Sequence, residues 1–160
     1  MYSLSKDVKE QLIEYYNKQE SLVKIYKNEN NLEMAYLTKW TILEKFIKLL
    51  TFQKRKIYLA NDLKAWLKYL EIGGKKPVDI SKFSIECPIL PQEKEFKEVL
   101  NNYGFDCEKA WNIMKSTGSH RKYRNKLAHD GERISERQFS KLFVDLEGLV
   151  EYFFNGLSQT

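Results

Sequence analysis

The chain contains few of the residues that break helices or build disulfide and metal sites. Its 160 residues include only seven Gly and three Pro, which argues against a turn-rich β architecture. The two cysteines, Cys87 and Cys107, are isolated in the sequence, without CxxC spacing or a histidine cluster. Neither a zinc site nor a disulfide framework is therefore indicated, and we expect a cytoplasmic protein with reduced thiols.

Long apolar runs are also missing. The first ten residues contain no apolar core of the kind found in signal peptides. The most apolar stretch, Phe46–Phe52, is short and is interrupted by Lys48. We therefore expect no membrane association, and we expect one domain over residues 1–160 with enough chain to bury a core.

Arginine and histidine are scarce, and most of them lie together. The chain has five Arg and two His, and four of the arginines and both histidines lie within residues 115–141: His120, Arg121, Arg124, His129, Arg133 and Arg137. This window holds eight Lys or Arg against three Asp or Glu, whereas the remaining chain holds nineteen of each sign. The net charge of +5 is therefore local, and it surrounds the only side chains that ordinarily titrate near neutral pH.

Apolar residues recur at helical spacing along nearly the whole chain. The pattern predicts helices over residues 5–27, from about 32 to 50, over 55–72, 92–103 and 106–114, and after a capping box at Ser135–Gln138. Residues 75–91 break the pattern and predict an irregular loop, which either crosses the end of the bundle or covers a site or interface. We expect an all-α, up-and-down bundle of four to six helices.

The last helix has the most regular apolar pattern. An unbroken stripe runs through Phe139, Leu142, Phe143, Leu146, Leu149, Val150, Phe153, Phe154 and Leu157. This stripe predicts packing in the core, either alone or with an extension into a dimer interface.

The hexapeptide Arg124-Asn125-Lys126-Leu127-Ala128-His129 combines two chemical abilities. A guanidinium presents a planar set of donors that suits phosphate oxygens, and an imidazole takes or gives a proton at neutral pH. Cleavage of RNA without a metal needs both abilities. We therefore take Arg124 and His129 as the candidate catalytic pair, and we expect no metal and no cofactor.

Helix geometry limits how this pair can act. Five helical steps place Arg124 and His129 about 140° apart around the axis, so they do not converge on one phosphate within a single helix. Asn125 lies four residues before His129, on the same face, where it either orients the imidazole or is a helix cap or surface residue. Two copies of the segment facing each other across a two-fold axis would complete a site, so the spacing favours a homodimer.

The hexapeptide resembles the R-x(4–6)-H motif of the HEPN domain family, including the polar residue that follows the arginine. The resemblance is close over the motif, and elsewhere it covers only length, helix count and motif position. It implies an all-α bundle whose active members are dimeric, metal-independent endoribonucleases that cut single-stranded RNA and leave 2′,3′-cyclic phosphates. Many members are toxins, antiphage effectors or CRISPR-associated modules, so an antitoxin or defence-system partner is expected. Some toxins carry a tyrosine two residues after the histidine that a partner modifies; Gly131 stands there.

Several neighbouring residues have two possible roles. Arg121, Lys122 and Lys126 are candidates for an RNA-attracting rim, or they form a solvated basic face. His120 is expected to be an exposed residue of the same rim, or it has a second role in proton transfer. Tyr123 either stacks on a base or packs in the core.

Arg124 also has a structural alternative, which is an ion pair with Asp130, Glu132 or Glu44. Two other functions stay open: a catalytically inactive HEPN-like dimer that binds RNA, a nucleotide or a protein partner, and a structural domain whose basic patch docks an acidic partner.

Overall fold

The computed structural model describes residues 4–72, 91–130 and 135–159. Within that part of the chain there are six helices and no strand: α1 (Lys6–Asn28), α2 (Leu32–Ile72), α3 (Glu93–Asn102), α4 (Cys107–Met114), α5 (Ser119–Asp130) and α6 (Glu136–Gln159). The predicted all-α bundle is confirmed for these residues, whereas 75–90 of the predicted loop lie outside them. None of the described helices is both long and apolar enough to cross a membrane.

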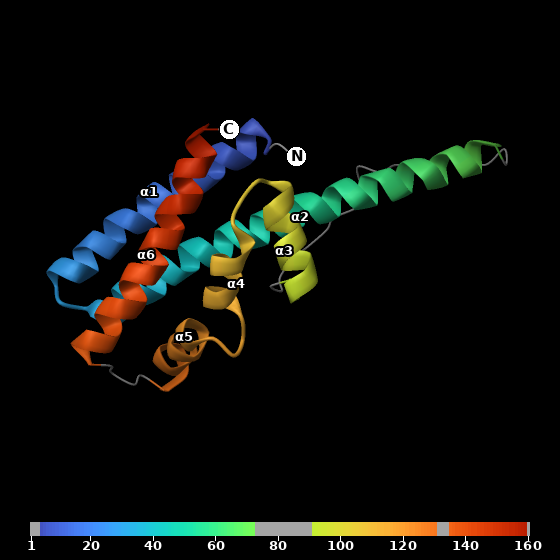
Figure 1. The fold of residues 1–160 in the computed structure, drawn as a ribbon. Coiled ribbons are helices and arrows are strands. Elements are labelled where there is room, and N and C mark those ends of the chain that lie inside the picture. Colours follow the sequence, from blue (N-terminus) through green and yellow to red (C-terminus); the bar gives the residue numbers. More distant parts are fainter. Residues whose placement is uncertain (1–3, 73–90, 131–134, 160) are drawn as a thin grey trace.

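The helices pack around the first half of α2 (Figure 1). α1 and α2 form an antiparallel pair, and α6 lies beside α1, where the rings of Tyr16 and Phe154 stack at 4.1 Å between centroids. α3 and α4 pack against each other and α3 also packs on α2, while α5 contacts α2 and α4 at the lower end of the bundle. The second half of α2 projects away from the other helices (Figure 1).

Residues 32–72 form one helix, so the prediction of separate helices over 32–50 and 55–72 was wrong. The sequence between these two stretches contains no Gly or Pro that would end a helix. At the junction, Oγ1 of Thr51 donates to the carbonyl oxygen of Ile47 at 2.9 Å, within the helix. The hydroxyl is therefore satisfied locally, and nothing terminates α2 before Ile72.

α1 and α3 each end at a residue with positive φ, and backbone N–H groups at that residue and the next one bond to carbonyl oxygens of the last helical turn. Gly104 has φ 79°, its N–H donates to Asn101, and the N–H of Phe105 donates to Leu100. Asn30, with φ 57°, closes α1 in the same way. These bonds satisfy carbonyls that the helix leaves unpaired, and they confirm the predicted breaks near residues 28–31 and at Gly104.

Buried side chains from all six helices form one continuous core. Phe46 of α2 lies at its centre, stacked on Phe153 of α6 at 4.5 Å and edge-on to Phe105 at 5.3 Å. Aromatic pairs of this kind contribute about 0.5–1.5 kcal/mol each beyond their buried area. They fix α6 and the α3–α4 connection on α2, which is the frame that carries α5.

The stripe predicted on the last helix is confirmed as core. Eight of its nine residues are buried, and Leu142 is half-buried. The backbone N–H of Gln138 donates to Oγ of Ser135 at 3.4 Å, so the serine half of the predicted capping box is present.

Candidate functional site

α5 carries the hexapeptide and begins directly after a tight turn. A Cβ atom added to Gly118 would lie 2.8 Å from the carbonyl oxygen of Asn112, so this position accepts only glycine without a shift of the backbone. The carbonyl of Gly118 accepts from the N–H of Lys122 at 3.1 Å, inside the first turn of α5. This turn separates α4 from α5, which runs from Ser119 to Asp130, whereas Gly131 lies outside the described residues.

One face of α5 is buried, and it includes His120. His120, Tyr123 and Leu127 lie at i, i+3 and i+7, and each is less than 9% exposed. The expectation of an exposed His120 on an RNA-binding rim was therefore wrong. Its Nδ1 lies 3.3 Å from the hydroxyl of Tyr36, which donates to the backbone carbonyl of His120 at 3.2 Å.

The surroundings of His120 disfavour its charged form. Burial lowers the pKa of His120, and the carboxylate of Asp145, 3.7 Å from Nε2, opposes this only in part. A neutral imidazole held by a tyrosine hydroxyl joins α5 to α2, so His120 has a structural role in this arrangement.

Tyr123 packs in the core, which was one of the two roles predicted for it; the other was stacking on a base. Its ring meets that of Tyr36 edge-on, with centroids 4.9 Å apart, and it is 5% exposed. Burial raises the pKa of Tyr123 to about 12. No described residue forms a hydrogen bond with its hydroxyl. A base cannot stack on this ring unless α5 moves, so the buried position of Tyr123 disagrees with the predicted stacking on a base.

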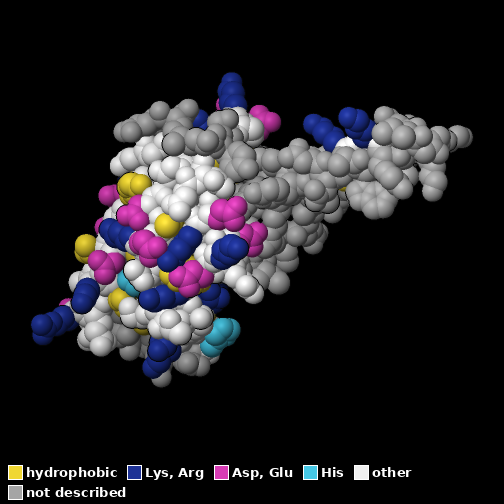
Figure 2. All heavy atoms as spheres, turned by 45° about the vertical axis from the view of Figure 1, so that its right-hand side comes forward, with side chains coloured by type: hydrophobic (Ala, Val, Ile, Leu, Met, Phe, Trp, Pro, Cys, Tyr) yellow, Lys and Arg dark blue, Asp and Glu magenta, His cyan; other side chains and the backbone are white. Residues whose placement is uncertain are grey.

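The opposite face of α5 is open to solvent. Lys122, Asn125 and His129 follow one another at i, i+3 and i+7, and all three are exposed, as is Lys126 beside them. Figure 2 shows one histidine side chain standing clear of the surface with Lys and Arg side chains nearby. Of the four predicted rim residues, Lys122 and Lys126 are therefore the two exposed ones.

Arg124 lies at the border between these faces and is partly exposed. Its Nη1 donates to Oδ1 of Asn125 at 3.1 Å. The expected bond between Asn125 and His129 is absent from this arrangement, because the amide oxygen is turned to the guanidinium. No carboxylate among the described side chains pairs with Arg124; the alternatives Glu132 and the Asp130 side chain lie outside them.

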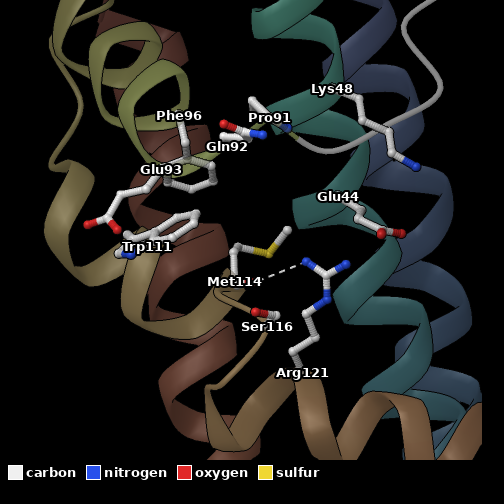
Figure 3. A pocket seen from close by; sticks show the side chains of 10 residues that line it. All are labelled: Glu44, Lys48, Pro91, Gln92, Glu93, Phe96, Trp111, Met114, Ser116 and Arg121. Atoms are coloured by element: carbon white, nitrogen blue, oxygen red, sulfur yellow. Dashed lines mark hydrogen bonds between the residues drawn. The ribbon is translucent and has the colours of Figure 1, made fainter.

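Arg121 borders a pocket of about 500 Å³. Its Nη1 donates to the carbonyl oxygen of Met114 at 3.2 Å, which makes it part of the fold rather than of a free rim. Figure 3 shows its guanidinium pointing between Met114 and Glu44. Sequence reasoning singled out Glu44 as a possible partner of Arg124, but the structure places Glu44 on the pocket that contains Arg121.

No family model, curated protein or solved structure matches this chain. Among the described residues no three His, Cys, Asp or Glu side chains are grouped to hold a metal ion. The candidate site consists of α5 with its three candidate catalytic side chains, Arg124, Asn125 and His129, and of the pocket that borders this helix. The helix does not bring Arg124 and His129 together, because α5 is regular through both.

Proposed function

We propose that this protein is a metal-independent endoribonuclease of HEPN type that cuts single-stranded RNA. The observation that carries the proposal is the placement of Arg124 and His129 on one surface helix of an all-α bundle. The core uses neither side chain. Arg124 bonds only to the adjacent Asn125 among the described residues, and the imidazole of His129 is exposed in the last turn of α5.

The reaction assigns one task to each side chain. A base removes the proton of the 2′-hydroxyl, the 2′-oxygen attacks phosphorus, and the 5′-oxygen leaves with a proton. The products are a 2′,3′-cyclic phosphate and a 5′-hydroxyl. His129 moves protons, and Arg124 stabilises the charge that develops on the phosphorane oxygens.

The proposed active unit is a homodimer. Because Arg124 and His129 leave α5 about 140° apart, one copy presents them in different directions. Two copies of α5 related by a two-fold axis would place the arginine of one near the histidine of the other. The exposed Lys122 and Lys126 would then flank the shared site and attract the phosphate backbone.

The motif also suggests a biological setting. We propose a cytoplasmic toxin or antiphage effector that an antitoxin or another defence-system component controls. Gly131, which stands where some toxins have a modified tyrosine, argues against control by modification at that position.

The test is cleavage of a labelled single-stranded RNA in EDTA by the purified chain and its variants. We expect cyclic phosphate ends, and a loss of about 10²–10⁴-fold in His129→Ala and about 10²–10³-fold in Arg124→Ala. Arg137→Ala removes another exposed arginine, on α6, and serves as the matched control that retains cleavage. Undiminished cleavage by both motif variants would overturn the proposal.

A second candidate function follows from the Arg124–Asn125 bond. Since Asn125 is turned to the arginine, no described residue orients the imidazole of His129. This favours, as an alternative, a catalytically inactive dimer that binds RNA, a nucleotide or a protein partner. Salt-dependent RNA binding without cleavage, at any protein concentration and in all variants, is the result that identifies it.

A further inference from the structure

The pocket beside α5 has two chemically different walls (Figure 3). On one side Phe96 of α3 and Trp111 of α4 present aromatic rings, with centroids 5.2 Å apart and planes tilted by 60°. On the other side lie Glu44 and Lys48 of α2 and Arg121 of α5, whose guanidinium points between Met114 and Glu44. The volume of about 500 Å³ falls within the range of small-molecule sites, about 300–1,000 Å³.

The aromatic wall suits a flat ring. Phe96 is buried and supports Trp111, whose own side chain remains partly exposed. A partly exposed indole held by a buried ring is a stacking surface that needs little reordering when a ring binds. Single-stranded nucleic acids bind such surfaces because every base has an aromatic face.

The charged wall distinguishes among the bases. A carboxylate accepts two parallel hydrogen bonds from guanine, whose N1–H and N2–H₂ donors are adjacent, whereas the other bases offer no such pair of neighbouring donors. Guanidinium and ammonium groups donate to guanine O6 and N7. Arg121 uses one donor on the Met114 carbonyl and carries five in all, so it can serve both partners.

The pocket also borders α5, the helix that carries the candidate catalytic residues. Arg121 and Arg124 are three residues apart on α5, so they are neighbours on its surface. Arg124 is therefore a candidate to contact the phosphate of a nucleotide whose base enters the pocket.

We propose that this pocket binds a guanine base of the RNA strand, with Trp111 stacking on it and Glu44 and Arg121 reading its edge. The inference rests on the proposed function for its substrate, and it names the base preference of that same site.

The experiment measures binding of 5′-GMP, 5′-AMP, 5′-CMP and 5′-UMP to the whole chain by calorimetry. We expect saturable binding of GMP at least tenfold tighter than of CMP or UMP. Trp111→Ala should weaken GMP binding about tenfold or more, while Trp111→Phe keeps a ring and loses less. Glu44→Gln should remove the preference for GMP over AMP. Glu151→Gln, an exposed glutamate on α6, is the matched control. Circular dichroism confirms that each variant folds.

Two results overturn the inference: no saturable binding of any nucleotide, or equal binding of all four that Trp111→Ala and Glu44→Gln leave unchanged. The proposed function fails separately. His129→Ala should abolish RNA cleavage and leave GMP affinity unchanged. Selective GMP binding by a chain that never cuts RNA would support the guanine-binding pocket and contradict the proposed nuclease activity. RNA cleavage without base preference and without GMP binding would support the nuclease activity and contradict the guanine-binding pocket.

Discussion

Nη1 of Arg124 donates a hydrogen bond over 3.1 Å to Oδ1 of its neighbour Asn125. The bond ties a partly exposed arginine to an exposed amide, and it restrains a long side chain that would otherwise sample many rotamers in solvent. In this arrangement Asn125 positions the arginine of the motif rather than its histidine. That distinction can be measured.

Asn125→Ala should lower kcat about tenfold, because one hydrogen bond to a charged group contributes about 1.5–3 kcal/mol and part of it is replaced by water. The pH optimum of cleavage should stay where it is in the wild type, since the imidazole is not the partner. Asn125→Asp keeps an acceptor for Arg124 and should recover kcat, with a higher KM because the added negative charge repels RNA. A shifted pH optimum in Asn125→Ala would instead assign Asn125 to His129.

His120 should make the protein less stable as the pH falls. Burial lowers the folded-state pKa of His120 below its ordinary value of about 6.5, so in the window between these two values the unfolded chain binds more protons. The free energy of unfolding is then unaffected above pH 6.5 and decreases as the pH drops through that window. Asp145, the carboxylate that faces Nε2, reduces the effect. Urea unfolding between pH 5 and 8 should show a smaller pH dependence in His120→Gln, and identical slopes would contradict the assignment.

Tyr36 and Tyr123 touch edge-on but should respond oppositely to loss of their hydroxyls. The hydroxyl of Tyr36 donates to the His120 carbonyl and lies beside Nδ1 of His120, so Tyr36→Phe removes a buried hydrogen-bond partner of His120 and should cost about 1–2 kcal/mol. The hydroxyl of Tyr123 has no partner among the described residues, so Tyr123→Phe should be neutral or stabilise by up to about 1 kcal/mol. Chemical unfolding of both variants is the measurement. A loss in Tyr123→Phe as large as that in Tyr36→Phe would show that its hydroxyl is paired.

Local signals in the sequence predicted the helix ends and the core stripe of α6. The turn after α1 and the break at Gly104 depend on residues that tolerate positive φ, and the last helix depends on a repeated apolar spacing. The continuity of α2 was missed because its apolar pattern weakens between its two halves, while the backbone continues without a helix breaker. Weak periodicity is thus a poor sign of a helix end when Gly and Pro are absent.

Burial of charged and titratable groups was much harder to predict. Lys39 is 1% exposed and pairs with Glu20 of α1 and with Glu147 of α6 at 3.7 Å, partners distant in the chain. His120 could have been placed by its spacing from Tyr123 and Leu127, which puts all three on one face. Its partner Tyr36, however, lies 84 residues away. The pocket was missed for the same reason, since its walls come from α2, α3, α4 and α5.

The two-chain site makes a quantitative prediction about mixed dimers. Arg124→Ala and His129→Ala should each be inactive alone, because each homodimer lacks one group. Refolding them together in equal amounts gives heterodimers in about half of the dimers, and each heterodimer holds one of the two arginine–histidine pairs that cross the interface. Cleavage should therefore recover to about a quarter of the wild-type rate.

Mixing wild type with the double variant Arg124→Ala/His129→Ala separates this arrangement from a site within one chain. The heterodimer then has both groups on the same copy and no pair across the interface. Activity should fall to about a quarter, which is the share of wild-type homodimers. An activity of about one half, together with no recovery in the first mixture, would show that a single α5 suffices and that the helix must bend or unwind to bring Arg124 and His129 together.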